Sequence, residues 1–217
     1  MPGDDAPLGE RDGAWLAAYA TPELDADSAE HSVFSSMLRK GVPHARNFKV
    51  QRVQHRGLWG RFAHFRDHEL KPYNGGDANE QWLFHGTGAL APTDVLAHPG
   101  GLDPRFSDGG GFYGAGTYLA ETAAYQIGGR YAHRVRGFGG GRMQLLVVRA
   151  ACGTPQELGT RVDAETRAMR MPGQRPDGQA YDSVRAGPHR PFRAGTSSDD
   201  DGDATSIVHV LFESQQM

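Results

Sequence analysis

Two short segments carry residue types that could do chemistry. The first, His85-Gly86-Thr87, follows the short apolar run 81–84. The second is the block 114–121, a glycine-rich turn that continues into Tyr118. An imidazole donates or accepts hydrogen bonds near neutral pH, and a phenol ring combines an apolar face with a polar tip. A histidine at a strand end is by itself more often structural than catalytic, so the order and spacing of the two segments indicate the site.

The glycine-rich stretch 109–116 superficially suggests a phosphate-binding loop. No Gly-Lys-Ser/Thr follows it, which excludes a P-loop. A dinucleotide-binding loop needs a strand before its first glycine, whereas residues 103–108 contain proline and polar residues. Both nucleotide-loop interpretations are therefore weak.

Metal binding has little support, although the chain contains ten histidines. His64 and His68 lie one helical turn apart, but no cysteine pair or carboxylate completes a ligand set. The acidic residues between 199 and 203 are interpreted as a solvated loop. We therefore expect surface histidines and no metal.

Nucleophilic catalysis also finds little support. The chain lacks the Gly-x-Ser-x-Gly pattern of a serine hydrolase. Its single cysteine, Cys152, follows the mostly apolar run 145–151, which predicts a small packed residue at a strand end. One cysteine forms no intrachain disulfide, which fits a reducing compartment.

Composition narrows the class of protein. The 217 residues suit one large domain, and 38% hydrophobic residues with 30 glycines and 13 prolines indicate a core wrapped in long loops. A net charge of −3 gives no basic field, so nucleic acid is an unlikely partner. The N-terminus does not resemble a signal peptide, and no run approaches the roughly 20 apolar residues of a membrane span. We expect an intracellular protein, cytoplasmic or nuclear, with no membrane partner.

Hydrophobic periodicity predicts an α+β fold. Residues 1–28 form an acidic, flexible extension, residues 29–217 one domain, and residues 153–181 a long irregular stretch. Helices are predicted at 28–38, 58–70, 93–98 and, largely, 118–134; strands are predicted at 47–54, 81–84, 143–150 and 206–212. Helices do not alternate regularly with strands, which argues against a doubly wound parallel sheet.

Several motifs occur together in the order of one known family. They are Trp82–Thr87, Gly101–Asp103, Tyr113–Ala120, Tyr181–Val184 and Val208–Phe212, preceded by an opening segment at Val50–Trp59. With these motifs the chain resembles the catalytic domain of the poly(ADP-ribose) polymerase family, a diphtheria-toxin-like ADP-ribosyltransferase, and most closely its mono-ADP-ribosylating branch. The resemblance runs from about residue 30 to the end of the chain.

The resemblance implies a fold and an activity. The fold would be two packed, mostly antiparallel sheets around an NAD⁺ cleft with flanking helices. The enzyme would cleave NAD⁺ between nicotinamide and ribose, transfer ADP-ribose to a side chain of an acceptor protein and need no metal. By this alignment the family's last strand, with its third triad position, would lie beyond Met217. The alternative is a catalytically silent module that binds NAD⁺ or ADP-ribose.

The resemblance also implies roles for particular residues. His85 would bond an adenine-ribose hydroxyl, and the Gly86 backbone would hold the nicotinamide carboxamide. Tyr118 would stack under the nicotinamide ring, and the family's spacing selects Tyr131 over Tyr125 as the second ring.

Three further residues are implied at the NAD⁺ site. Thr87 completes the histidine motif. Gln126 stands where the family has a serine that bonds the carboxamide. Residues 103–111 would form a loop over the dinucleotide, with Arg105 as a candidate phosphate or ribose contact.

Overall fold

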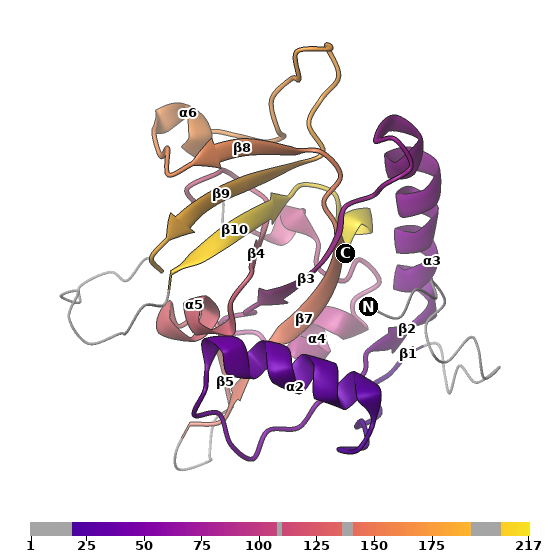
Figure 1. Ribbon diagram of the computed structural model, residues 1–217, viewed down its shortest axis with the longest axis vertical. Coiled ribbons are helices and arrows are strands. Elements are labelled where there is room, and N and C mark those ends of the chain that lie inside the picture. Colours follow the sequence, from indigo (N-terminus) through magenta and orange to yellow (C-terminus); the bar gives the residue numbers. More distant parts are fainter. Residues whose placement is uncertain (1–18, 108–109, 136–140, 192–204) are drawn as a thin grey trace.

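A six-stranded mixed sheet forms the centre of the molecule (Figure 1). The computed structural model describes residues 19–107, 110–135, 141–191 and 205–217. The strand order is β7-β3-β4-β10-β9-β8, with bounds β3 Glu80–His85, β4 Thr117–Ala120, β7 Leu146–Ala151, β8 Pro155–Gly159, β9 Ser183–His189 and β10 Ser206–Leu211. Neighbouring strands are antiparallel except β8 and β9, which are parallel.

Within the described residues, two small strand pairs and five α-helices surround this sheet. The pairs are β1 (Tyr19–Ala20) with β2 (Gln54–His55), and β5 (His133–Arg134) with β6 (Met143–Gln144). The helices are α2 (Ala29–Gly41), α3 (Arg56–His64), α4 (Pro92–Ala97), α5 (Ala123–Gly128) and α6 (Ala164–Arg167). The chain of α3 continues as a π-helical turn, Phe65–Leu70, and a 3₁₀ turn, Lys71–Tyr73; further 3₁₀ turns are Pro104–Phe106 and Ser214–Gln216. In Figure 1, α6 lies beside β8, and α2 lies near α5 at the opposite end.

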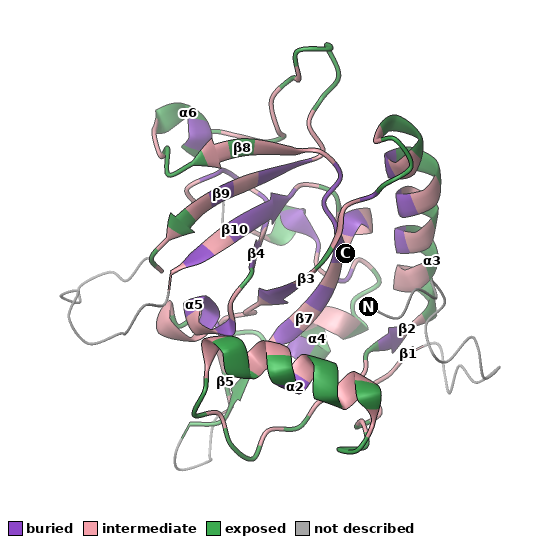
Figure 2. Ribbon diagram, viewed as in Figure 1, coloured by how far each residue is buried: buried purple, intermediate pink, exposed green. Residues whose placement is uncertain are grey.

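Apolar side chains pack in two clusters against the sheet, and the central strands are largely buried (Figure 2). One cluster contains Leu83, Leu119, Leu146, Val148 and Leu211. The second, which we call the aromatic cluster, contains buried Tyr113, Ala120, Tyr125, Val184, Ala186, Val208 and Val210, with Phe112, Tyr118, Tyr131 and Phe212 packed against it. Strand β10 contributes to both clusters because successive side chains of a strand point to opposite faces.

Six elements expected from periodicity are confirmed; among them, the helix expected at 93–98 is α4, and the strand expected at 143–150 is β7 with β6 before it. Helix α2 begins after Ser28, whose hydroxyl accepts the His31 N–H at 3.1 Å as an N-cap. The expected helix from Leu58 appears as α3 and its π-helical continuation, and the expected strands at 81–84 and 206–212 appear as β3 and β10.

Three local predictions are wrong. Residues 118–134 are not largely helical, because Thr117–Ala120 pairs with strands on both sides and tertiary pairing overrides helix propensity. Residues 47–54 form only an isolated bridge at Gln51 and the start of β2. The stretch 153–181 contains β8 and α6.

The α+β class is confirmed, with a correction to the sheets. Six strands form one continuous mixed sheet where two packed sheets were expected. Of the expected extension 1–28, residues 1–18 lie outside the described residues, and Tyr19–Ala20 pairs with β2. The expected strand beyond Met217 lies outside this sequence and stays a prediction. No helix within the described residues is long and apolar enough to cross a bilayer.

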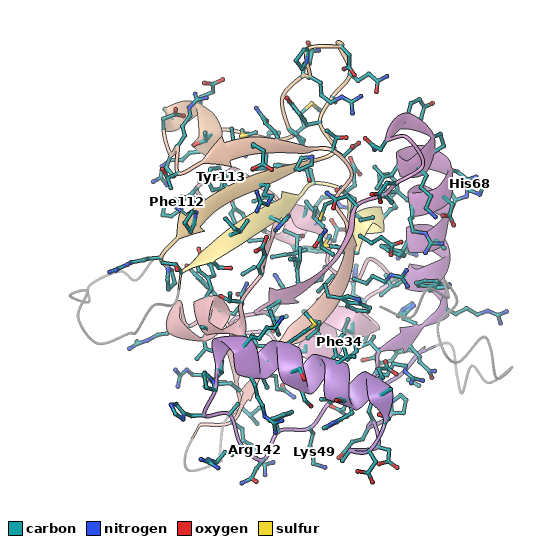
Figure 3. All side chains as sticks on the ribbon, viewed as in Figure 1. Phe34, Lys49, His68, Phe112, Tyr113 and Arg142 are labelled. Carbon is teal, nitrogen blue, oxygen red and sulfur yellow. The ribbon has the colours of Figure 1, made fainter. Side chains whose placement is uncertain are left out.

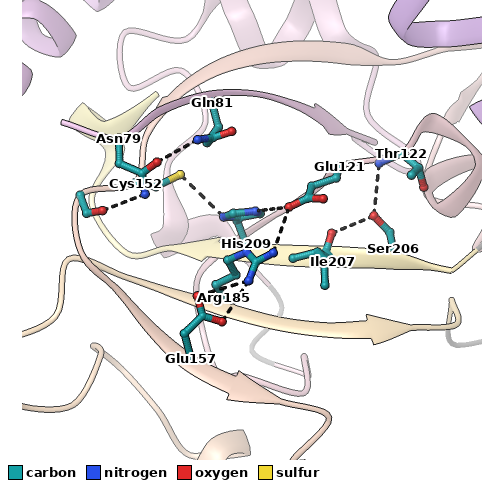
Figure 4. Close-up of polar contacts among 11 residues, drawn as sticks. Asn79, Gln81, Glu121, Thr122, Cys152, Glu157, Arg185, Ser206, Ile207 and His209 are labelled. Atoms are coloured by element: carbon teal, nitrogen blue, oxygen red, sulfur yellow. Dashed lines mark hydrogen bonds and ion pairs between the residues drawn. The ribbon is translucent and has the colours of Figure 1, made fainter. Parts of the chain in front are cut away.

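A row of polar side chains crosses the sheet (Figure 4). His209 on β10 donates from Nε2 to Glu121 Oε1 at 3.1 Å, which leaves Nδ1 as acceptor for the Cys152 thiol at 3.8 Å. Arg185 on β9 lies 3.8 Å from Glu121 and 3.1 Å from Glu157 on β8. These contacts fix the register of β4 against β10 and its neighbours.

Cys152 is predicted to be unreactive in the folded protein. The residue is fully buried, and burial raises the pKa of its thiol to about 12, so the nucleophilic thiolate is scarce at neutral pH. A maleimide should modify the native protein at least about 10-fold more slowly than the urea-unfolded chain. Mass spectrometry of timed aliquots measures both rates, and equal rates would contradict the burial of this thiol.

Candidate active site

Strands β3 and β4 bring His85 and Tyr118 together. The strands pair through Phe84 and Ala120, and His85 is the last residue of β3. Nδ1 of His85 lies 2.8 Å from the backbone carbonyl oxygen of Tyr118. A carbonyl oxygen only accepts, so Nδ1 carries the proton, and Nε2 of the neutral ring is left as an acceptor.

The charge state of His85 follows from its surroundings. Burial lowers the pKa of this imidazole, and the bond to the Tyr118 carbonyl offsets part of that shift. The ring is therefore neutral at pH 7. A neutral imidazole with a free Nε2 lone pair can accept a hydrogen bond from a ligand hydroxyl.

The Tyr118 hydroxyl is fully used inside the protein. It donates to the Gly114 carbonyl at 2.9 Å and accepts the Tyr113 N–H at 2.8 Å. These two bonds hold the ring in one orientation. Since the polar tip is occupied, the part of Tyr118 suited to a ligand is its ring face.

Two glycines permit the close approaches that build the site. A Cβ on Gly86 would lie 2.3 Å from the carbonyl carbon and oxygen of Tyr131, so only glycine lets these segments touch. Gly114 has φ +76°, and its Cβ would lie 1.9 Å from the Met169 carbonyl oxygen. The sequence pattern around Tyr118 thus reflects backbone packing and not a phosphate loop.

The backbone of Tyr131 packs against residues 86–88. Its carbonyl accepts the Gly88 N–H at 2.8 Å, which ties residues 86–88 to the chain after α5. The rings of Tyr131 and Tyr125 are 5.9 Å apart at an interplanar angle of 34°. Tyr125 is buried in the aromatic cluster, whereas Tyr131 is half-buried and packs at its margin.

The other expected site residues have partners of their own. The Gln126 side chain is buried and donates to the Phe84 carbonyl at 2.9 Å, so it fastens α5 to β3. The Thr87 hydroxyl donates to the Leu90 carbonyl at 2.7 Å and stabilises a turn. The Arg105 side chain is 84% exposed and bonds Asp103, with its Nε 2.9 Å from Oδ1. The structure therefore brings His85 to the Tyr118 backbone and Gly86 to the Tyr131 backbone, and the Gln126 amide joins α5 to β3.

The sequence analysis missed two contacts near Tyr118, both made by His189 on β9. The Tyr113 hydroxyl bonds Nε2 of His189 on β9, and the Phe112 ring lies 6.1 Å from the His189 ring. Neither contact has a local sequence signal, because the partners are more than seventy positions apart.

His64 and His68, the two histidines considered as metal ligands, lie close together. The rings of His64 and His68 are 4.8 Å apart. Across 19–107, 110–135, 141–191 and 205–217, no group of three or more histidine, cysteine or acidic side chains could hold a metal ion. The acidic run between 199 and 203 lies outside these residues.

Comparison with known proteins identifies relatives of this chain. The family model described as "Poly(ADP-ribose) polymerase catalytic domain" matches residues 31–190. The mouse protein mono-ADP-ribosyltransferase PARP11 is 31% identical over 108 residues, 49% of this chain and 32% of that protein. Human PARP11 is 30% identical over 108 residues, 49% of this chain and 31% of its own length. Human mono-ADP-ribosyltransferase PARP14 is 28% identical over 136 residues, 62% of this chain and 7% of its own length. The match thus spans no more than about a third of each relative.

Stability is predicted to fall below about pH 6.5, because burial lowers the pKa of His85, His189 and His209 from 6.5. The unfolded chain then binds more protons than the folded one as the pH drops, so the free energy of unfolding is greatest above pH 6.5 and decreases below it. Urea unfolding at about pH 7.5 and about pH 5.5 measures the difference.

The variant His209→Gln keeps a donor for Glu121 and removes one titrating group. It should therefore lose less stability between the two pH values than the unmodified protein. An unchanged or steeper loss would contradict the assignment of His209 as a buried neutral imidazole.

Proposed function

Because the chain belongs to the poly(ADP-ribose) polymerase catalytic domain family, whose substrate is NAD⁺, we propose that it transfers single ADP-ribose units from NAD⁺ to a protein side chain and releases nicotinamide. The proposed catalytic domain is residues 29–217. The observation that carries the proposal is the 2.8 Å bond from His85 Nδ1 to the Tyr118 carbonyl. It leaves Nε2 of the imidazole as an acceptor and ties His85 to the residue whose phenol ring is held in one orientation.

The proposed reaction depends on positioning. Tyr118 and Tyr131 hold nicotinamide between their rings, and the Gly86 backbone bonds its carboxamide. Nε2 of His85 accepts a hydrogen bond from an adenine-ribose hydroxyl and so holds the other end of the dinucleotide. The bond between ribose C1 and the pyridinium nitrogen breaks, its electron pair leaves with neutral nicotinamide, and the acceptor attacks C1 and loses its proton.

The energetic contributions are of different kinds. Each aromatic contact contributes about 1 kcal/mol beyond area burial, so the two rings mainly orient the leaving group. Holding the ribose in a reactive geometry lowers the entropic part of the barrier and needs neither a metal nor a covalent nucleophile.

Strand pairing supports transfer of a single unit. Strand β4, which carries Tyr118, pairs with β3 and β10. Strand β3 supplies His85, and β10 pairs with the other edge of β4, so we propose β10 as a second candidate location of the third triad position, besides the one expected beyond Met217. The β10 residues in the aromatic cluster are Val208 and Val210. An apolar residue there matches the mono-transferase pattern, and the names of the three relatives agree with it.

One observation favours the alternative, a module that binds NAD⁺ without cleaving it. The Gln126 amide nitrogen donates to the Phe84 carbonyl in a buried position, so one N–H of this side chain is used inside the protein and is not available for the carboxamide contact that the family's serine makes. Weaker orientation of nicotinamide would slow cleavage more than binding.

The variant His85→Ala tests the proposal. Removing the ribose contact should lower nicotinamide release and protein labelling from isotopically labelled NAD⁺ by roughly 100-fold or more. His68→Ala is the control, because His68 lies on the π-helical turn after α3, away from Tyr113, whose N–H bonds the Tyr118 hydroxyl (Figure 3). If the unmodified protein binds NAD⁺ in calorimetry but releases no nicotinamide, the binding-module alternative replaces the proposal.

Alanine variants of Tyr131 and Tyr125 are predicted to lose different properties, the first NAD⁺ binding and the second stability. Tyr131→Ala should weaken NAD⁺ binding with little loss of stability, since this side chain is only half-buried. Tyr125→Ala should lower the free energy of unfolding by about 3 kcal/mol, because it empties part of the core. Calorimetric titration and urea unfolding of both variants check this. A larger binding loss in folded Tyr125→Ala would show that the family spacing selected the wrong ring.

A further inference from the structure

A cation is held at the flank of the Tyr118 site. Phe112 packs against the aromatic cluster beside Tyr118, and the next residue, Tyr113, bonds the Tyr118 hydroxyl. Figure 3 shows Phe112 and Tyr113 side by side near β9. The guanidinium carbon of Arg167, the last residue of α6, lies 4.8 Å from the centre of the Phe112 ring.

The position of Arg167 is fixed from two directions. Helix α6 has a capping box in which Asp163 and Thr166 exchange hydrogen bonds of 2.9 and 3.0 Å. Just after α6, the Met169 carbonyl accepts the Ala115 N–H at 3.2 Å, which ties this segment to the loop before Tyr118. The guanidinium is therefore placed by the same contacts that shape the proposed active site.

The charge of Arg167 is not neutralised within the described part of the chain. The two acidic side chains of its own segment, Asp163 and Glu165, both bind Arg161. No ion pair to Arg167 is present among the described residues, and its side chain is exposed. Stacking on an aromatic face leaves the N–H edge of a guanidinium free to bind a carboxylate in a bidentate manner.

His189 adds a second donor near Phe112. The buried Tyr113 hydroxyl bonds Nε2 of His189, and burial raises the pKa of Tyr113 to about 12, so the phenol keeps its proton at neutral pH. In the tautomer in which Nε2 accepts this phenol proton, Nδ1 of the neutral His189 ring carries the ring proton and can donate it to a ligand. Arg167 and His189 thus present N–H groups from α6 and β9 around one aromatic ring.

We propose that Arg167, assisted by His189, binds a carboxylate of the acceptor protein, so that the enzyme prefers acceptor segments with an aspartate or glutamate near the modified residue. This inference rests on the proposed transferase function and names its substrate class. The same N–H groups could bind the diphosphate of NAD⁺, and the experiment separates the two anions.

The test compares two peptides that differ only by glutamate-to-glutamine changes around one acceptor residue. Arg167→Gln should lower kcat/KM for the acidic peptide about 10-fold, the effect of one charge-assisted contact, and change the neutral peptide by less than about 2-fold. The KM for NAD⁺ and nicotinamide release without peptide should be unchanged.

The matched control is Arg39→Gln, because Arg39 also stacks on a phenylalanine, Phe48, at 5.1 Å but lies on α2. Arg167→Lys should retain part of the preference through its charge. A raised KM for NAD⁺ in Arg167→Gln, or equal losses for both peptides, would overturn the proposal.

Fluorescence anisotropy with the acidic peptide gives a measurement that needs no turnover. Tighter binding of the acidic than of the neutral peptide, lost in Arg167→Gln, supports the inference even if the protein releases no nicotinamide. Equal binding of both peptides overturns it, whether or not NAD⁺ is cleaved.

Discussion

The hydrogen bond from His85 Nδ1 to the Tyr118 carbonyl links the end of one strand to the middle of the next. It assigns the proton of the imidazole to Nδ1, leaves Nε2 as an acceptor and ties His85 to the backbone of Tyr118. A side chain in any other tautomer would lose this bond in a buried setting, where an unmade hydrogen bond costs about 1–3 kcal/mol. The order of strands β3, β4 and β10 matters because it maintains this contact.

Close backbone approach is the second constraint on the site. Gly86 against Tyr131, and Gly114 against the Met169 carbonyl, bring together segments that are far apart in sequence. The aromatic rings are thereby oriented by main-chain contacts and not by side-chain hydrogen bonds alone. Orientation by main-chain contacts suits a reaction in which the leaving group departs readily and the protein contributes mainly by positioning it.

Sequence reasoning succeeded where the signal was local. The Ser28 cap, the apolar run before His85 and the buried strand 206–212 each carry their own pattern, and Cys152 proved to be packed as expected. Sequence reasoning failed where contacts between residues far apart in the sequence determine the local structure. Helix-favouring residues after Tyr118 form a strand because β3 and β10 flank them, and the amide of Gln126 turns to the Phe84 carbonyl. The stacking of Arg167 on Phe112 joins positions with no shared pattern.

The polar row from Cys152 through His209, Glu121 and Arg185 to Glu157 has a consequence for how this sheet can vary. Each residue of the row contacts the next, so a substitution at one position leaves its neighbour with an uncompensated charge or an unpaired hydrogen-bonding group. Substitutions along the row are therefore tolerated in compensating sets, one strand adjusting to another. Since Glu121 directly follows β4, such combined substitutions would also shift the backbone that carries Tyr118. Divergence on this side of the sheet is thus coupled to the shape of the opposite side.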